Sequence, residues 1–208
     1  MKIRQSISSL RKQIKNKNFT LIARDCVGGV LYHELGLEFL TPTINLFFEP
    51  EDFNYFCLYL KDYINGEIKE LKEEGLDYPI GMIIPKNNAQ TKKVIKVHFM
   101  HYLNFDEALE KWLERKKKIN YDNIYVLSTM CYVKETATIN DELIAKWNEI
   151  HYPKVMISDQ KYGFDDEFII DKPKECHEYA WLLYEPDQNN PGIRVFNAFD
   201  FINFLNKK

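Results

Sequence analysis

The chain is poor in cysteine, and its few cysteines are scattered. They lie at Cys26, Cys57, Cys131 and Cys176, and no two of them form a C-x-x-C pair. This spacing argues against a zinc ribbon and against a thioredoxin-like redox motif. A disulfide framework is typical of smaller secreted chains that cannot build a sufficient hydrophobic core. We therefore expect the thiols to be reduced.

Long apolar runs are also missing. The N-terminal segment MKIRQSISSLRKQIKNKNF lacks the apolar h-region of a signal peptide. No run approaches the roughly 20 apolar residues of a membrane-spanning helix, so we expect a cytoplasmic protein without a membrane span. Residues 1–17 predict a short basic amphipathic helix that either packs on the domain or touches an anionic membrane surface. We favour packing, because the segment has no Trp or Phe anchor.

An excess of positive charge is absent as well. The net charge of -3 gives no basic field that would indicate nucleic acid as a partner. One basic run, RKKK at 115–118, can contact a phosphate, although a solvated last helical turn is the preferred interpretation. No metal site is predicted either. His98 and His101 form H-x-x-H on a predicted strand, where side chains three positions apart point to opposite faces.

The sequence does contain a regular alternation of strands and helices. Apolar and alternating runs predict strands at 19–23, 44–48, 80–84, 94–103, 123–130 and 154–158. Helices are predicted at 30–37, 50–64, 67–74, 104–118, 141–150 and 200–206. Gly36 predicts a helix end, and Asn104 with Glu107 predicts a capping box.

This alternation predicts an α/β fold with a three-layer, mostly parallel (mixed) sheet, Rossmann-like, and helices on both faces. With 208 residues, 45% of them hydrophobic, we expect one domain over 1–208. Residues 160–208 predict a β-rich C-terminal extension with short antiparallel strands at 168–171, 179–185 and 193–196.

The stretch from Phe19 to Pro50 contains most of the candidate site. It reads FTLIARDCVGGVLYHELGLEFLTPTINLFFEP, which predicts a strand, a glycine turn, a helix and a second strand. Ligands of parallel sheets bind beyond the carboxyl ends of the strands. This rule selects four places: the 24–29 turn, the region of Glu49, the strand end at 98–101, and residues 128–131.

Cys26 is the candidate nucleophile. It follows a strand and stands at the expected N-terminus of a helix, where backbone amides and the macrodipole lower the pKa of a thiol. His101, at a strand end, is the candidate base. The adjacent charges act in opposite directions, because Arg24 favours the thiolate and Asp25 opposes it. The alternative is a buried structural cysteine, which is the commoner state of a free thiol.

A second set of residues predicts ligand binding. Gly28 and Gly29 allow close backbone approach at a helix start, which suits a phosphate. Glu49 follows the predicted second strand, about where Rossmann-type folds place a ribose-binding acid. A nucleotide, such as a nucleotide-sugar substrate, would fit, although D-C-V-G-G is not the G-x-G-x-x-G motif. The alternative is a plain tight turn, with Glu49 as a helix-start acid. The other residues predicted to bind the ligand are Asp25, His33, Thr43 and Ser128.

Four blocks of the sequence carry a resemblance to a known family. They are NFTLIARDCVGGVLYHELGLEFLTPTINLFFEPEDFNYF, YPIG, VHFMHYLNFDEALEKWLERKKKINYDNIYVLST and the final hydrophobic helix, which together cover most of the chain from Lys17 onward. These blocks resemble an uncharacterised bacterial family of exopolysaccharide or capsular polysaccharide biosynthesis proteins. Members of that family read more like S-N-N-C-x-G-G at the first turn, where this chain has Arg24 and Asp25. The resemblance implies an α/β fold and a cytoplasmic role in building a surface glycan, and it implies no particular reaction.

Three classes of function follow from the residues and the resemblance. The first is a transferase of exopolysaccharide or capsule biosynthesis that uses a nucleotide-activated donor. The second is a non-catalytic accessory or scaffold protein that binds other polysaccharide-synthesis proteins. The third is a cysteine-dependent hydrolase or acyltransferase. The first predicts a small-molecule or glycan substrate at the 24–29 turn, the second a stable protein partner, and the third a reactive Cys26.

Overall fold

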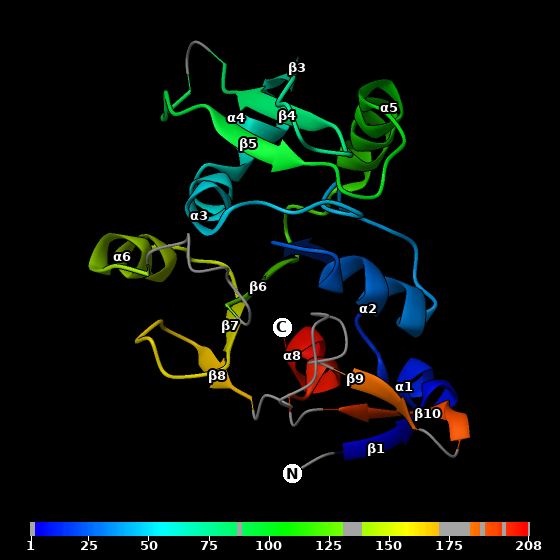
Figure 1. Cartoon of the computed structure of the whole chain (residues 1–208). Helices are drawn as coiled ribbons and strands as arrows, with labels where there is room; N and C mark the ends of the chain where they lie inside the picture. The colour runs from blue at the N-terminus through cyan, green and yellow to red at the C-terminus, as the bar shows by residue number, and fades with distance from the viewer. Residues whose placement is uncertain are drawn as a thin grey trace.

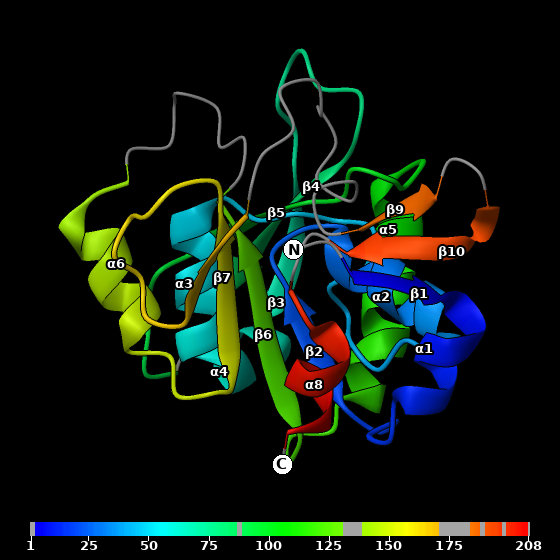
Figure 2. The same ribbon diagram turned by 90° about the horizontal axis from the view of Figure 1, so that it is seen from below.

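A four-stranded parallel sheet lies at the centre of the structure. The computed structural model describes residues 3–86, 89–130, 139–170, 184–187, 190–196 and 199–207. The sheet consists of β2 (Thr20–Ala23), β6 (Ile124–Thr129), β7 (Lys154–Ser158) and β8 (Glu167–Ile169), in that order. Each neighbouring pair is parallel, and β2, β6 and β7 run side by side in Figure 2. The predicted mostly parallel sheet is therefore confirmed.

Helices cover both faces of this sheet, because successive side chains of a strand point to opposite faces. The face with Leu21 and Leu127 packs against α1 (Ile7–Gln13), α2 (Val27–Leu35) and α8 (Phe201–Asn206). The face with Ile22 and Val126 packs against α3 (Pro50–Leu58) and α6 (Asp141–Asn148). The helices of these two groups lie on opposite sides of the sheet in Figure 2, as the predicted three-layer α/β fold requires.

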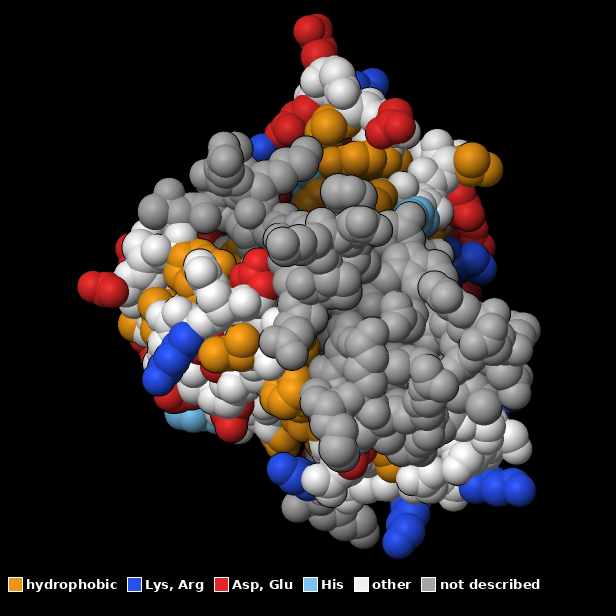
Figure 3. All heavy atoms as spheres, turned by 60° about the horizontal axis from the view of Figure 1, so that its bottom comes forward, with side chains coloured by type: hydrophobic (Ala, Val, Ile, Leu, Met, Phe, Trp, Pro, Cys, Tyr) orange, Lys and Arg blue, Asp and Glu red, His pale blue; other side chains and the backbone are white. Residues whose placement is uncertain are grey.

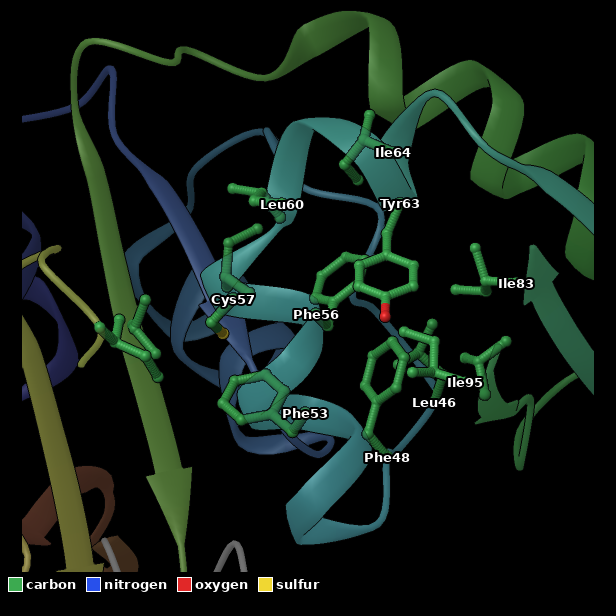
Figure 4. Packing of buried hydrophobic residues seen from close by; sticks show 14 of the residues in the cluster. Leu46, Phe48, Phe53, Phe56, Cys57, Leu60, Tyr63, Ile64, Ile83 and Ile95 are labelled. Atoms are coloured by element: carbon green, nitrogen blue, oxygen red, sulfur yellow. The ribbon is translucent and has the colours of Figure 1, made fainter. Parts of the chain in front are cut away.

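A separate antiparallel sheet is inserted between β2 and β6 in sequence. Its strands are β3 (Glu67–Leu71), β4 (Ile80–Ile84) and β5 (Ile95–His98), in that order. Next to them in sequence are α4 (Leu60–Ile64), α5 (Phe105–Arg115) and the 3-10 turn η1 (Lys116–Lys118). This sheet forms the upper part of Figure 1. Phe48, Phe56 and Tyr63 pack toward Ile83 and Ile95 of this sheet, as Figure 4 shows.

Two predictions for the inserted region are wrong. The charged stretch 67–74, predicted as a helix, forms β3, an edge strand whose charged side chains keep the open edge in water. The predicted strand 44–48 forms no ladder, although Phe47 and His98 make one isolated antiparallel bridge. The left-handed backbone of Asn45, with φ of 60°, interrupts the extended segment. The predicted strands 80–84 and 94–103 are β4 and β5 of the antiparallel sheet, and β5 already ends at His98.

The two ends of the chain meet in a third sheet. β1 (Ile3–Ser6), β10 (Asn190–Phe196) and β9 (Tyr184–Asp187) pair antiparallel in the order β1-β10-β9. Antiparallel strands in the C-terminal extension are confirmed here, whereas the predicted strand 168–171 is β8, which runs parallel to β7. Residues 179–183 of the predicted strand 179–185 lie outside the described residues. The N-terminal helix starts only at Ile7, because residues 3–6 pair with β10. None of the described helices is long and apolar enough to cross a membrane.

Candidate functional site

The segment from Ile44 to Glu49 joins the predicted places of the site. On one side, Phe48 N donates to Arg24 O at 2.9 Å, so the segment lies against the 24–29 turn. The 24–29 turn also adjoins the end of β6, because Arg24 N donates to Leu127 O at 3.0 Å. The carboxyl ends of β2 and β6 and the region of Glu49 are thus one place in the fold. Cys131, the last residue of the predicted 128–131 place, lies outside the described residues.

The other side of the segment contacts the end of β5. Phe47 and His98 exchange two backbone hydrogen bonds of 2.9 Å, and His101 N donates to Asn45 O at 3.3 Å. The predicted place at 98–101 therefore also adjoins the segment. Of the four places, only the 24–29 turn and residues 128–130 lie at carboxyl ends of parallel strands, to which the rule applies. The region of Glu49 and the end of β5 adjoin them through the segment 44–49.

A buried charge cluster stands at the carboxyl ends of β2 and β6. Arg24 is 6% exposed and Asp25 is 8% exposed. Arg24 donates from Nη1 to Phe48 O at 3.1 Å and from Nη2 to Thr129 Oγ1 at 3.3 Å, and its Nη2 lies 3.5 Å from Asp25 Oδ2. Asp25 accepts from Val27 N at 3.1 Å and from Thr129 Oγ1 at 2.6 Å. The carboxylate thereby stabilises the N-terminus of α2 and ties the turn to β6.

Two buried donors beside this cluster have no hydrogen-bond partner within the described structure. They are Arg24 Nε and Ser128 Oγ. Ala23 is in register with Leu127, so the residues that follow, Arg24 and Ser128, stand next to each other at the ends of two adjacent strands. A buried donor without a partner costs roughly 1–3 kcal/mol. Two such donors at the ligand-binding edge of a parallel sheet point to a binding position for ligand oxygens.

Cys26 does not have the low pKa that its helix-terminal position predicts. Burial, the larger cause, and the adjacent Asp25 carboxylate raise the pKa of its thiol to about 12. The thiol donates weakly to Leu46 O at 4.0 Å. The prediction of a lowered pKa is wrong, because burial and Asp25 outweigh the end of α2. His101 is exposed, and no described contact joins it to Cys26, so their pairing stays a prediction.

The two glycines of the turn differ in how tightly they are enclosed. A Cβ on Gly28 would lie 2.5 Å from Ala23 Cβ, whereas a Cβ on Gly29 would lie 3.5 Å from its nearest neighbour, Ile44 Cγ2. Gly28 therefore permits the close approach of α2 to β2, which is one role of glycine in Rossmann-type turns. At Gly29 there is room for a Cβ, so packing does not require a glycine there.

This difference predicts opposite effects of the same substitution. We expect Gly28→Ala to lower the free energy of unfolding by about 1–3 kcal/mol, because the added methyl forces α2 away from β2. Gly29→Ala should leave it unchanged or raise it by up to about 1 kcal/mol, because alanine is the better helix former. Urea unfolding followed by circular dichroism measures both. Equal destabilisation by the two substitutions would contradict the close packing at Gly28.

Three other residues predicted to bind the ligand have other surroundings. Thr43 is buried, and its Oγ1 accepts a hydrogen bond from Ala23 N at 3.1 Å. This bond gives a partner to a backbone N–H group on the edge strand β2. His33 lies in the last turn of α2, at the opposite end from the turn, with its side chain 80% exposed. Glu49 is the exposed N-cap residue of α3. Because 44–48 is not a strand of the parallel sheet, Glu49 does not follow a sheet strand as a ribose-binding acid would. Ligand binding by these three residues stays a prediction.

His98 also lies at the candidate site, although its sequence pattern, H-x-x-H, raised only the question of a metal ligand. It is 8% exposed, and its ring stacks on Phe47 with centroids 4.3 Å apart, while Tyr78 meets it edge-on at 6.0 Å. Neither ring nitrogen has a hydrogen-bond partner in the described part of the chain. Burial lowers the pKa of His98 and outweighs the opposing effect of Glu49. The imidazole is therefore neutral at pH 7.

The alternation along 95–101 could not have singled out His98. It places His98 on the face of Lys96 and His101 on the face of Ile95 and Val97, whereas the structure has His98 buried and His101 exposed, because the regular strand ends at His98. Over the described ranges, no three His, Cys, Asp or Glu side chains form a group that could hold a metal ion.

Comparison with known proteins assigns the chain to a family. A family model described as a domain of unknown function, DUF1919, matches residues 1–206. The chain belongs to the DUF1919 family. This DUF1919 protein is also 24% identical, over 200 residues, to an uncharacterized protein of Haemophilus influenzae, and the match covers 95% of this chain and 89% of the relative. Neither description states a reaction or a ligand.

The basic run of this DUF1919 protein is engaged within the fold. Arg115 Nη1 donates to Tyr102 Oη at 2.7 Å, and Lys116 Nζ donates to Ile64 O at 3.2 Å. Lys118 Nζ lies 2.9 Å from a carboxylate oxygen of Glu38. These contacts agree with a structural role for the run, and the candidate site stays with the carboxyl ends of β2 and β6.

Proposed function

We propose that this protein is a transferase of surface-polysaccharide biosynthesis that binds a nucleotide-activated donor at the carboxyl ends of β2 and β6. The observation that carries the proposal is the pair of buried donors, Arg24 Nε and Ser128 Oγ, that have no hydrogen-bond partner among the described residues. Donors from a fixed guanidinium and a hydroxyl suit the oxygens of a phosphate group. The glycan setting rests on the sequence resemblance to exopolysaccharide and capsule biosynthesis proteins.

The electrostatics of the turn support an anionic ligand. Asp25 already accepts hydrogen bonds from Val27 N and Thr129 Oγ1, so its charge is largely satisfied inside the cluster. Gly28 and Gly29 occupy the first turn of α2, where backbone N–H groups have no partner inside the helix. Together with the macrodipole, these groups add partial positive charge beside Arg24.

Ser128→Ala tests the proposal. The free variant should be as stable as the wild type or up to about 1 kcal/mol more stable, because the substitution removes a buried hydroxyl without a partner. The same variant should lose most of the stabilisation that UDP-glucose, or another member of a nucleotide-sugar panel, gives to the wild type. That stabilisation is about 2.7 kcal/mol at a ligand concentration of 100 times Kd. Thermal-shift assays and isothermal titration calorimetry measure both effects.

Ser158→Ala is the matched control. Ser158 is buried at the same end of β7, but its Oγ donates to Glu167 Oε1 at 2.7 Å. Its loss should cost about 1 kcal/mol of stability and leave nucleotide-sugar binding unchanged. If no nucleotide or nucleotide sugar stabilises the wild type, the donor site is rejected. A polysaccharide-synthesis protein that then binds the chain in a purified system would favour the accessory function.

A further inference from the structure

We infer that Phe47, Glu49, Tyr78 and His98 form a second subsite, which binds a neutral, hydroxyl-bearing ligand. The inference rests on the proposed function in one respect: a transferase with its donor at Arg24 and Ser128 would bind its acceptor sugar here. Binding of a neutral ligand at this subsite does not depend on whether the protein is a transferase.

The imidazole of His98 offers one donor and one acceptor, and neither has a partner in the described structure. The stacked ring of Phe47 and the edge contact with Tyr78 fix the orientation of the imidazole. A sugar hydroxyl is both a donor and an acceptor, so it can bind either nitrogen. The partly exposed rings of Phe47 and Tyr78 add the apolar surface on which sugar rings commonly pack.

The charges around His98 select against an anion. The charged groups that face it are Glu49, Glu73, Asp52 and Lys96, and Tyr78 also faces Asp77. Glu73 forms an ion pair with Lys96, and Asp52 lies 3.5 Å from Lys93 Nζ. At the top of Figure 3, over the antiparallel sheet, acidic side chains lie around hydrophobic ones, with a few Lys or Arg side chains between them. A phosphate or carboxylate would be repelled here.

Glu49 is the acidic group that is free to bind a ligand. It is exposed, and no ion pair or hydrogen bond of its carboxylate is found among the described residues. A carboxylate accepts hydrogen bonds from two hydroxyls at once, which is the pattern that a sugar presents. Glu49 stands two residues after Phe47, so both side chains can face His98 from the same side of the extended segment.

The two subsites are adjacent, and they differ in the charge of the ligand that they favour. Phe48 O accepts from the Arg24 guanidinium, and the preceding residue, Phe47, stacks on His98. An anionic donor at Arg24 and a neutral acceptor at His98 would therefore bind on neighbouring residues of one segment. This arrangement separates the two ligands by charge.

Nuclear magnetic resonance of the wild-type chain tests the subsite. The probes are methyl β-D-glucopyranoside, other neutral methyl glycosides, and methyl β-D-glucuronide, which carries a carboxylate on the same ring as the glucoside. The readout is the imidazole ¹⁵N signals of His98, assigned by their loss in His98→Phe and through neighbouring backbone signals. We expect a neutral glycoside to shift these signals and the glucuronide to bind at least about tenfold more weakly.

Glu49→Gln should weaken binding of the neutral glycoside roughly tenfold and reduce the discrimination against the glucuronide. Glu51→Gln is the control, because Glu51 lies at the same helix start but pairs with Lys93. This variant should change neither the affinity for the neutral glycoside nor the discrimination against the glucuronide. The subsite is refuted if no neutral glycoside shifts the His98 signals, or if the glucuronide binds as tightly as the glucoside. UDP-glucose binding, followed separately through Ser128→Ala, reports on the donor site, so either site can fail while the other stands.

Discussion

Replacing Arg24 with methionine is expected to lower the free energy of unfolding by about 3–5 kcal/mol, the usual cost of removing one partner of a buried ion pair. The guanidinium is 3.5 Å from Asp25 and donates to Phe48 O and Thr129 Oγ1. Without it, the buried carboxylate loses its counter-charge and the Phe48 carbonyl loses a donor. Urea unfolding, with an m-value unchanged from the wild type, measures the effect.

The double variant Arg24→Met/Asp25→Asn identifies the cause. Asparagine keeps an oxygen that can accept from Val27 N, but it removes the uncompensated charge. Stability should therefore recover by about 1–2 kcal/mol relative to Arg24→Met alone, since neutralising both partners is far less costly than leaving one. A double variant that is less stable than either single variant would show that Arg24 acts through packing rather than through its charge.

Cys26 is expected to react with iodoacetamide at neutral pH on the order of a thousandfold more slowly than an ordinary thiol, because only the thiolate reacts. An unperturbed thiol has a pKa of about 9, whereas burial and Asp25 raise the pKa of Cys26 to about 12. The raised pKa means a smaller thiolate fraction at every pH below it. Time-resolved alkylation, read by mass spectrometry at the peptide that contains Cys26, measures the rate.

Asp25→Asn provides the internal check on this rate. It removes the second cause of the raised pKa and leaves burial in place, so alkylation of Cys26 should become faster but stay well below that of an exposed thiol. Rapid, selective labelling of Cys26 in the wild type at neutral pH would contradict this expectation. It would favour the cysteine-dependent hydrolase or acyltransferase instead.

Features set by neighbouring residues could be predicted from the sequence. Gly36 ends α2 with a left-handed φ of 67°, as its position after the helix indicated. Asn104 caps α5 by accepting from Glu107 N at 2.9 Å, as the capping-box pattern indicated. The central sheet and its two layers of helices could be predicted because strands and helices alternate along the sequence. A parallel sheet built from such units needs helices on both of its faces.

Features set by distant partners could not be predicted in this way. Periodicity shows which faces of 44–48 and 67–71 are apolar, but not which strand each segment meets. The left-handed Asn45 and the pairing of β3 with β4 decide that in three dimensions. The pKa of Cys26 likewise depends on burial by residues far away in sequence, which outweighs the helix end visible in the sequence.

The rule on strand ends located only part of the candidate site. It selected the 24–29 turn and Ser128 at the carboxyl ends of β2 and β6, whereas the selected end of 94–103 belongs to antiparallel β5 and adjoins them through the segment 44–49. The sequence indicated Arg24 only for its effect on the thiol, yet the structure holds it in a buried cluster where one donor has no partner within the described ranges. That the side chains of His98 and Ser128 have no hydrogen-bond partner in the part of the chain that the structure describes is a property of packing, which no local sequence pattern reveals.

A crystal structure of the protein with a stabilising nucleotide sugar tests the donor site most directly. One ligand oxygen, or two oxygens of one phosphate, should lie about 2.7–3.2 Å from Arg24 Nε and Ser128 Oγ. A nucleotide sugar bound elsewhere, with these two atoms still without a partner, would contradict the donor site at the carboxyl ends of β2 and β6.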